Sequence, residues 1–189
     1  MRILLASPFF ADHWDAGHFW ARALSRLGHS LVLWDYRLDM APPPGDYDFS
    51  LVLKGTADIP SLLKRPRAVY WPDELGRDPA SEAALGLYAR VYTAVRPTPP
   101  GMVWLPSGWD PKIHRQIPME KTLDSVFVGT FTLRKWRFLS EMNPSAIFGN
   151  DWSRNISHFP YLYAPVYLHD YVEVLNQAKV SINIHRGEV

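Results

Sequence analysis

Residues 124–137 read DSVFVGTFTLRKWR and predict a strand, a turn and a helix in immediate succession. Apolar residues up to Val128 form the strand, and Gly129 ends it. A helix with two early cations, Arg134 and Lys135, begins after the turn. The start of a helix carries backbone N–H groups without intrahelical partners and the positive end of the helix dipole, so an anion bound there accepts several hydrogen bonds. The stretch therefore predicts a phosphate-binding turn.

Three side-chain properties of this turn favour phosphate. Gly129 has no Cβ and lets the backbone come close to a ligand. Arg134 and Lys135 add positive charge, and an arginine fork can hold two phosphate oxygens at once. The stretch contains neither a full G-x-G-x-x-G nor a full G-x-x-x-x-G-K-[ST] pattern, so an ordinary strand-to-helix turn with two solvated cations is the alternative.

Composition and charge exclude several classes of protein. The 189-residue chain is 47% hydrophobic, so it can bury a substantial core as one large domain or as parts of two. Its net charge is only +1 and its basic residues form no long run, which disfavours a nucleic-acid partner. Without cysteine there are no disulfides and no thiolate metal ligands, as is typical of a cytoplasmic protein. No apolar stretch approaches the ~20 residues of a transmembrane segment. Eight tryptophans favour aromatic surfaces for flat or sugar-like ligands, with core filling as the alternative.

Strands and helices alternate along the chain, which predicts an α/β protein with parallel βαβ units and helices on both faces of each sheet. In the first half, a helix over 17–27 places Trp20, Ala23, Leu24 and Leu27 on one face. A second unit follows, with a capped helix that starts at Asp170, three residues before Glu173. The other expected elements are strands at 2–7, 30–35, 47–54, 68–71, 90–95, 102–105, 125–128, 146–148 and 180–184, and helices at 79–87 and 133–142.

Polar residues alternate with apolar ones in the last expected strand. Ser181, Asn183 and His185 alternate there with apolar side chains. A parallel strand that is covered on both faces is apolar throughout, so this end of the strand is expected to face a cleft.

Four blocks, in this order and spacing, resemble the CgeB-like glycosyltransferases, a family related to bacterial spore proteins. They are WLPSGWDP at 104–111, VFVGTF at 126–131, FGNDW at 148–152 and PVYLHDYVEVLNQAKVSINIHR at 165–186, and YWPDE at 70–74 resembles a further aromatic-acidic block. The resemblance implies the GT-B architecture, in which two Rossmann-like domains face a cleft. It implies a Rossmann-like N-terminal domain at 1–112 on the acceptor side and part of a C-terminal one at 113–189 on the nucleotide-sugar side, with an exposed connector over 106–122.

The resemblance also implies roles for residues of the second domain. Such enzymes transfer a sugar from a nucleotide-diphospho-sugar and stabilise the diphosphate leaving group without an essential metal or a cofactor. A ring or glycine of the FGNDW block would support the nucleobase, with core packing as the alternative for Phe148. Asn183 and His185 would approach the donor from the end of the last strand, or would form a hydrogen-bonded pair at the domain edge. The expected donor-binding residues are Gly129, Thr130, Arg134, Lys135, Phe148, Gly149, Trp152, Asn183 and His185.

An acceptor hydroxyl needs a base at the carboxyl ends of the N-terminal strands. His13 and His18 follow the first strand, and Asp73 follows a later one, so these three are the candidates. A surface loop with mixed charges is the alternative. The spacing of the histidines and of the aspartates near them matches no standard metal site, so no metal is expected.

The family normally continues past the Asn-x-His-Arg strand into a block with a Phe-Glu pair, whereas this sequence ends at Val189. About 70 residues then serve the second domain, fewer than the ~100–150 of a typical one. The sequence is therefore expected to be a truncated part of a glycosyltransferase, with an unknown glycan, protein or small-molecule acceptor. A non-catalytic nucleotide-binding or assembly module is one alternative, and its unfinished sheet edge would favour a homo-oligomer. A flavodoxin-type regulator, which predicts one compact sheet, is another.

Overall fold

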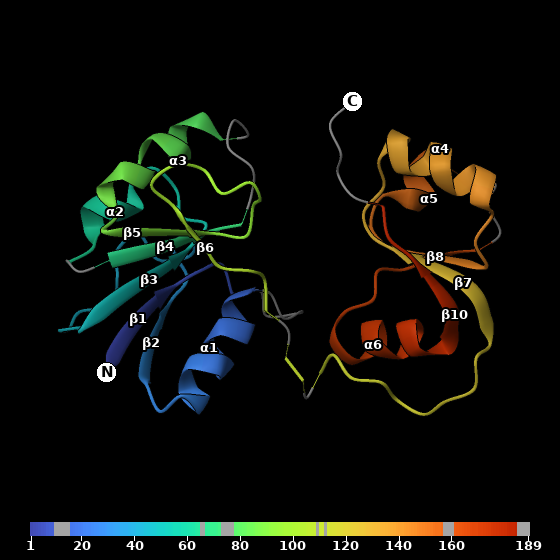
Figure 1. The fold of residues 1–189 in the computed structure, drawn as a ribbon, viewed down its shortest axis with the longest axis horizontal. Coiled ribbons are helices and arrows are strands. Elements are labelled where there is room, and N and C mark those ends of the chain that lie inside the picture. Colours follow the sequence, from blue (N-terminus) through green and yellow to red (C-terminus); the bar gives the residue numbers. More distant parts are fainter. Residues whose placement is uncertain are drawn as a thin grey trace. The chain divides into compact units, whose positions relative to one another are not determined.

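The computed structural model describes residues 1–9, 16–64, 67–72, 78–108, 110–111, 113–156 and 161–184. Contacts divide the chain into two compact units, which we call unit 1, Met1–Asp110, and unit 2, Pro111–Val189. The predicted boundary lies slightly later, between residues 112 and 113. Each unit contains its own sheet, in place of the one compact sheet that the flavodoxin-type alternative predicts (Figure 1).

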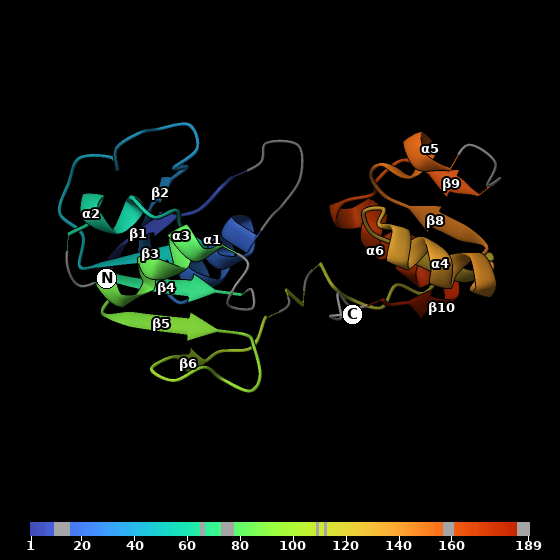
Figure 2. The same cartoon turned by 90° about the horizontal axis from the view of Figure 1, so that it is seen from above.

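Unit 1 is built on a six-stranded sheet in the order β2-β1-β3-β4-β5-β6, and every pairing in it is parallel. Figure 2 shows the strands side by side in this order. The chain adds β2 on one side of β1 and β3 on the other, so the topology reverses at β1. In open parallel sheets, ligands bind outside the carboxyl ends of the strands at such a reversal. The strands are β1 (Arg2–Ala6), β2 (Ser30–Trp34), β3 (Phe49–Leu53), β4 (Arg67–Trp71), β5 (Arg90–Thr93) and β6 (Val103–Trp104).

Helices cover both faces of this sheet, as the alternating sequence predicts. Helix α1 (Ala16–Arg26) lies on one side, while α2 (Ile59–Leu62) and α3 (Pro79–Ala83) lie on the other (Figure 1). Strand β1 serves two cores because successive side chains point to opposite faces. Its Ile3 packs in the core on the α1 side, and its Leu4 packs in the core on the other side.

Unit 2 has a four-stranded parallel sheet in the order β10-β7-β8-β9. Helices α4 and α5 lie on one side of this sheet and α6 lies on the other (Figure 1). The fold is thus α/β with parallel sheets and is compatible with a Rossmann-like fold. The elements are β7 (Leu123–Val128), α4 (Leu133–Met142), β8 (Ala146–Phe148), α5 (Trp152–Asn155), β9 (Leu162–Tyr163), α6 (Leu168–Gln177) and β10 (Ala178–Ile182).

Several predicted elements need correction. Helix α6 begins at Leu168 with Tyr167 at its N-cap and no side-chain cap bond, so Asp170 lies in the first turn and does not cap the helix. Strand β10 begins at Ala178, before the predicted start at residue 180. The predicted helix over 79–87 is split into α3 and a 3₁₀ turn at Leu85–Leu87. The short elements α2, α5 and β9 were not predicted.

The apolar face predicted for the first helix is also only partly correct. Trp20 and Leu24 pack against the sheet, whereas Ala23 is exposed and Leu27 is 71% exposed.

Among the residues that the structure describes, no helix has both the length and the apolar character needed to cross a bilayer.

Asp35 follows β2 at the carboxyl edge of the unit 1 sheet, where the topology reverses, and connects neighbouring segments there. Its carboxylate accepts hydrogen bonds from the Phe9 backbone N–H (2.9 Å) and from the Arg37 guanidinium (2.7 Å). The Arg37 hydrogen bond is the main cause that lowers the pKa of Asp35 to about 2, against an opposing effect of burial. The ionised carboxylate therefore ties the residues after β1 to those after β2.

We expect Asp35→Asn to lower the stability of unit 1 at neutral pH, with a pH dependence of defined sign. A carboxyl group with a lowered pKa in the folded state contributes its stabilisation above the unfolded pKa near 4, and loses it as the pH falls towards 2. The difference in free energy of unfolding between the wild type and Asp35→Asn should be constant above about pH 5 and shrink below pH 4. Denaturant titrations followed by circular dichroism would measure it. Asp39→Asn serves as the control, and a pH-independent difference would contradict the assignment.

Candidate functional site

The predicted phosphate-binding turn lies at the carboxyl edge of the unit 2 sheet. Two backbone hydrogen bonds hold it against the residues after β8. The Gly129 N–H donates to the Phe148 carbonyl (2.8 Å), and the Phe131 N–H donates to the Asn150 carbonyl (3.0 Å). The segments 129–131 and 148–150 therefore run together beyond their strands, and the first of them leads into α4.

Gly149 permits this close approach. Its φ is +151°, and a Cβ built on it would lie 2.1 Å from the carbonyl oxygen of Gly129. No side chain fits at that distance, and the backbone conformation itself favours glycine. The same Gly129 carbonyl accepts a hydrogen bond from the indole N–H of Trp152 at 2.6 Å. Gly149 and Trp152 thus jointly fix the position of the turn.

Thr132 caps the start of α4. Its backbone is extended, with φ −144° and ψ 150°, and its Oγ1 accepts a hydrogen bond from the Lys135 N–H at 3.2 Å. This is the usual N-cap arrangement of a threonine. The Nζ of Lys135 folds back and donates to the Thr130 carbonyl at 3.0 Å. The side chain of Lys135, in the first turn of α4, therefore lies over the turn that contains Gly129 and Thr130.

The first turn of α4 is positively charged. The first turn of α4 contains Arg134 and Lys135 and no acidic residue. The positive end of the helix dipole normally favours carboxylates and disfavours cations. The guanidinium of Arg134 lies 5.9 Å from the centre of the Phe138 ring, and both cations are half-buried. Together they concentrate positive charge at a helix start, where backbone N–H groups can donate hydrogen bonds to an anion.

The two aromatic residues predicted to support a nucleobase, Trp152 and Phe148, have different environments. Trp152 is only 1% exposed and packs edge-on against Phe127 and Phe131, so it holds the turn from within the core. Phe148 is half-buried and stacks on Tyr163, with ring centres 4.8 Å apart and planes at 19°. The sequence analysis did not identify Tyr163, which is 48% exposed, because β9 is too short to show a periodic pattern.

The other candidates are more dispersed. Asn183 is exposed and follows β10, the neighbour of β7 in the sheet, while His185 lies outside the described residues. His13 and Asp73 also lie outside them. His18 belongs to α1, and its ring lies edge-on to Phe9 with centres 5.4 Å apart. It therefore faces the residues that follow β1, where the sequence places an acceptor-side base.

Comparison of the chain with models of protein families and with curated proteins gave no match. The assignment of a function therefore depends on the geometry of these two sheet edges. Within the described ranges, no three His, Asp or Glu side chains are grouped so that they could hold a metal ion.

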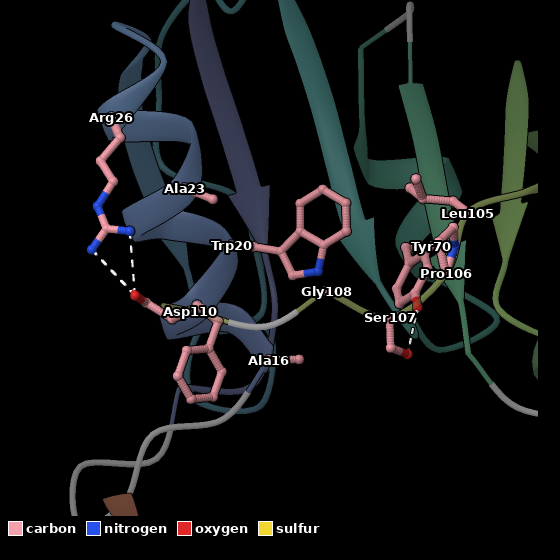
Figure 3. Close-up of a pocket in the computed structure, with 11 residues that line it drawn as sticks. Ala16, Trp20, Ala23, Arg26, Tyr70, Leu105, Pro106, Ser107, Gly108 and Asp110 are labelled. Atoms are coloured by element: carbon pink, nitrogen blue, oxygen red, sulfur yellow. Dashed lines mark hydrogen bonds and ion pairs between the residues drawn. The ribbon is translucent and has the colours of Figure 1, made fainter. Parts of the chain in front are cut away.

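Unit 1 contains a pocket of about 340 Å³ that the sequence did not reveal (Figure 3). It lies between α1 and residues 105–108 and 110, which follow β6. Its wall residues are distant in sequence, so no local pattern indicates it. In the sequence, the WLPSGWDP block indicates only a family resemblance. In the structure, residues of this block form one wall of the pocket. The pocket is lined by Ala16, Phe19, Trp20, Ala23, Arg26, Tyr70, Leu105, Pro106, Ser107, Gly108 and Asp110.

We expect Gly149→Ala to destabilise unit 2 by about 2 kcal/mol or more, because the methyl group meets the Gly129 carbonyl and the positive φ strains the backbone. Gly86→Ala is the control, since nothing lies within 4 Å of the added Cβ there. Chemical denaturation measures the loss, and hydrogen exchange of the β7 amides assigns it to unit 2. Equal stability of the two variants would show that the strand ends do not require this contact.

Proposed function

We propose that this chain is part of a metal-independent glycosyltransferase of GT-B type, which transfers a sugar from a nucleotide-diphospho-sugar to an acceptor. One observation carries the proposal. Arg134 and Lys135 occupy the first turn of a ten-residue helix at the carboxyl edge of a parallel sheet. An anionic ligand would remove the electrostatic conflict between these cations and the helix dipole.

The chemistry of sugar transfer suits this turn. The bond between the anomeric carbon and the diphosphate breaks, so negative charge develops on the leaving oxygen. Fixed cations and backbone N–H groups stabilise that charge without any metal. Lys135 is already held over the turn by the Thr130 carbonyl. The transferase therefore uses a preorganised turn and needs little rearrangement as charge develops.

The nucleotide and the acceptor would occupy different parts of the molecule. The half-exposed Tyr163, stacked on Phe148, offers a ring for the nucleobase near the carboxyl end of β8. In unit 1, His18 stands beside the end of β1 and is the described candidate for a base, together with the predicted His13 and Asp73. Two α/β units, each with a parallel sheet, are compatible with the GT-B architecture. The proposed enzyme would act in the cytoplasm.

A non-catalytic nucleotide-binding or assembly module is the second candidate. Strand β10 lies at the edge of its sheet, and its Val180 is 57% exposed. Edge strands with exposed apolar side chains readily pair with another chain. This edge favours a homo-oligomer or a partner protein, and it is compatible with nucleotide binding at the β7–α4 turn.

Calorimetry with a panel of nucleoside diphosphates tests the donor site. We expect one of them to bind saturably, and Arg134→Ala to weaken its binding about tenfold, which corresponds to about 1.4 kcal/mol. Arg137→Ala is the matched control, because this exposed arginine lies one turn further along the same helix. Absence of heat with every diphosphate, or equal losses in both variants, would contradict the proposal. Diphosphate binding without hydrolysis or transfer of any donor sugar would favour the non-catalytic module.

A further inference from the structure

We propose that the pocket of unit 1 is a binding site for a planar aromatic ring system that carries one hydroxyl group. All residues that line it belong to unit 1, so the proposal does not depend on sugar transfer by the β7–α4 turn. The pocket lies near the carboxyl ends of the strands: Tyr70 is the penultimate residue of β4, and Leu105 directly follows β6. Ligands of open parallel sheets bind at this edge.

The size of the pocket fits two fused rings. Small residues create the hollow, because Ala16, Ala23 and Gly108 leave space that larger side chains would fill (Figure 3). The volume of about 340 Å³ lies within the range of small-molecule sites. A cavity of about 150 Å³ already accommodates benzene, so this one has room for a bicyclic ligand.

The walls are aromatic. Trp20 projects from α1 towards the side of the pocket formed by Tyr70 and Leu105 (Figure 3). The rings of Trp20 and Tyr70 have centres 5.4 Å apart and are tilted by 51°. Two tilted rings offer both a face and an edge, and aromatic ligands favour offset-stacked and edge-to-face contacts. The wall therefore favours a flat ring over a flexible aliphatic chain.

Arg26 and Asp110 line the pocket but pair with each other, so a second, uncharged polar pair gives the pocket its specificity. The hydroxyl groups of Tyr70 and Ser107 lie 3.1 Å apart, with one donating to the other. Such a pair retains one O–H donor and acceptor lone pairs, which suit a single ligand hydroxyl. A monosaccharide has several hydroxyl groups, and burying them against aromatic walls without partners is costly. The side chains of this pocket thus select a phenol-like ring against a sugar.

Two ion pairs fix one wall of the pocket. Asp110 is buried, and its carboxylate bonds Arg22 and Arg26 of α1 at 3.3 Å each. These bonds hold Asp110 against the helix, as Figure 3 shows for Arg26. Because these three charged groups are already paired at the pocket wall, they fix its shape before a ligand enters. Preorganisation of this kind reduces the entropy that binding costs.

Titration of the full chain with 2-naphthol, followed by calorimetry, tests the site. We expect saturable binding with one ligand per chain, and at least tenfold weaker binding of decahydro-2-naphthol and of methyl glucoside. Ala23→Phe should weaken 2-naphthol binding at least tenfold, because the new ring fills the hollow. Ser25→Phe is the matched control, since it adds the same ring at an exposed position of α1 outside the pocket.

A second, conservative variant tests the hydroxyl contact. Ser107→Ala should weaken 2-naphthol about fivefold and leave 2-methylnaphthalene unchanged. Absence of 2-naphthol binding, equal binding to Ala23→Phe, or tighter binding of the glucoside would overturn the proposal. Nucleoside diphosphate binding should be the same in Ala23→Phe and the wild type, so failure at this pocket is distinguishable from failure at the donor site.

Discussion

Unit 2 depends on the contact between the backbones of Gly129 and Gly149, which leaves no room for a side chain between the ends of β7 and β8. The carbonyl of Gly129 also receives the Trp152 indole, so this one group connects both strand ends to the core. Because the turn is fixed there, the start of α4 is fixed as well. The positions of Lys135 and Arg134 follow from that start, and with them the positive charge at the sheet edge.

Close contacts at a glycine also fix the carboxyl edge of the unit 1 sheet. A Cβ at Gly17 would lie 2.7 Å from the Ser7 hydroxyl oxygen, so α1 begins in close contact with the end of β1. Asp35 and Asp110 then bind the neighbouring segments through hydrogen bonds and ion pairs. Tight packing near these contacts leaves the small residues of α1 as the place where a ligand has room. In each unit, glycine contacts fix the backbone near the site; the turn of unit 2 is positively charged, whereas the pocket of unit 1 is mainly apolar.

The sequence predicts the elements well where one periodic pattern dominates. The helix Leu133–Met142 and the strand Ala146–Phe148 have the predicted bounds, because apolar spacing, a threonine cap and a glycine stop agree locally. Burial of Trp152 was not predictable, since it depends on Phe127 and Phe131 from other elements. The Asp170 cap pattern was misleading because the chain enters α6 earlier, after Tyr167. The pocket of unit 1 combines three distant segments, so only the tertiary fold reveals it.

The central claim is that the turn from Gly129 to Lys135 holds a diphosphate. Amide chemical shifts measured by NMR during titration with the nucleoside diphosphate that binds best test it most directly. The account predicts saturable shifts at Gly129, Thr130 and the first amides of α4, which weaken with added salt. Shifts confined to other surfaces, or no shift in this turn at saturation, would contradict it.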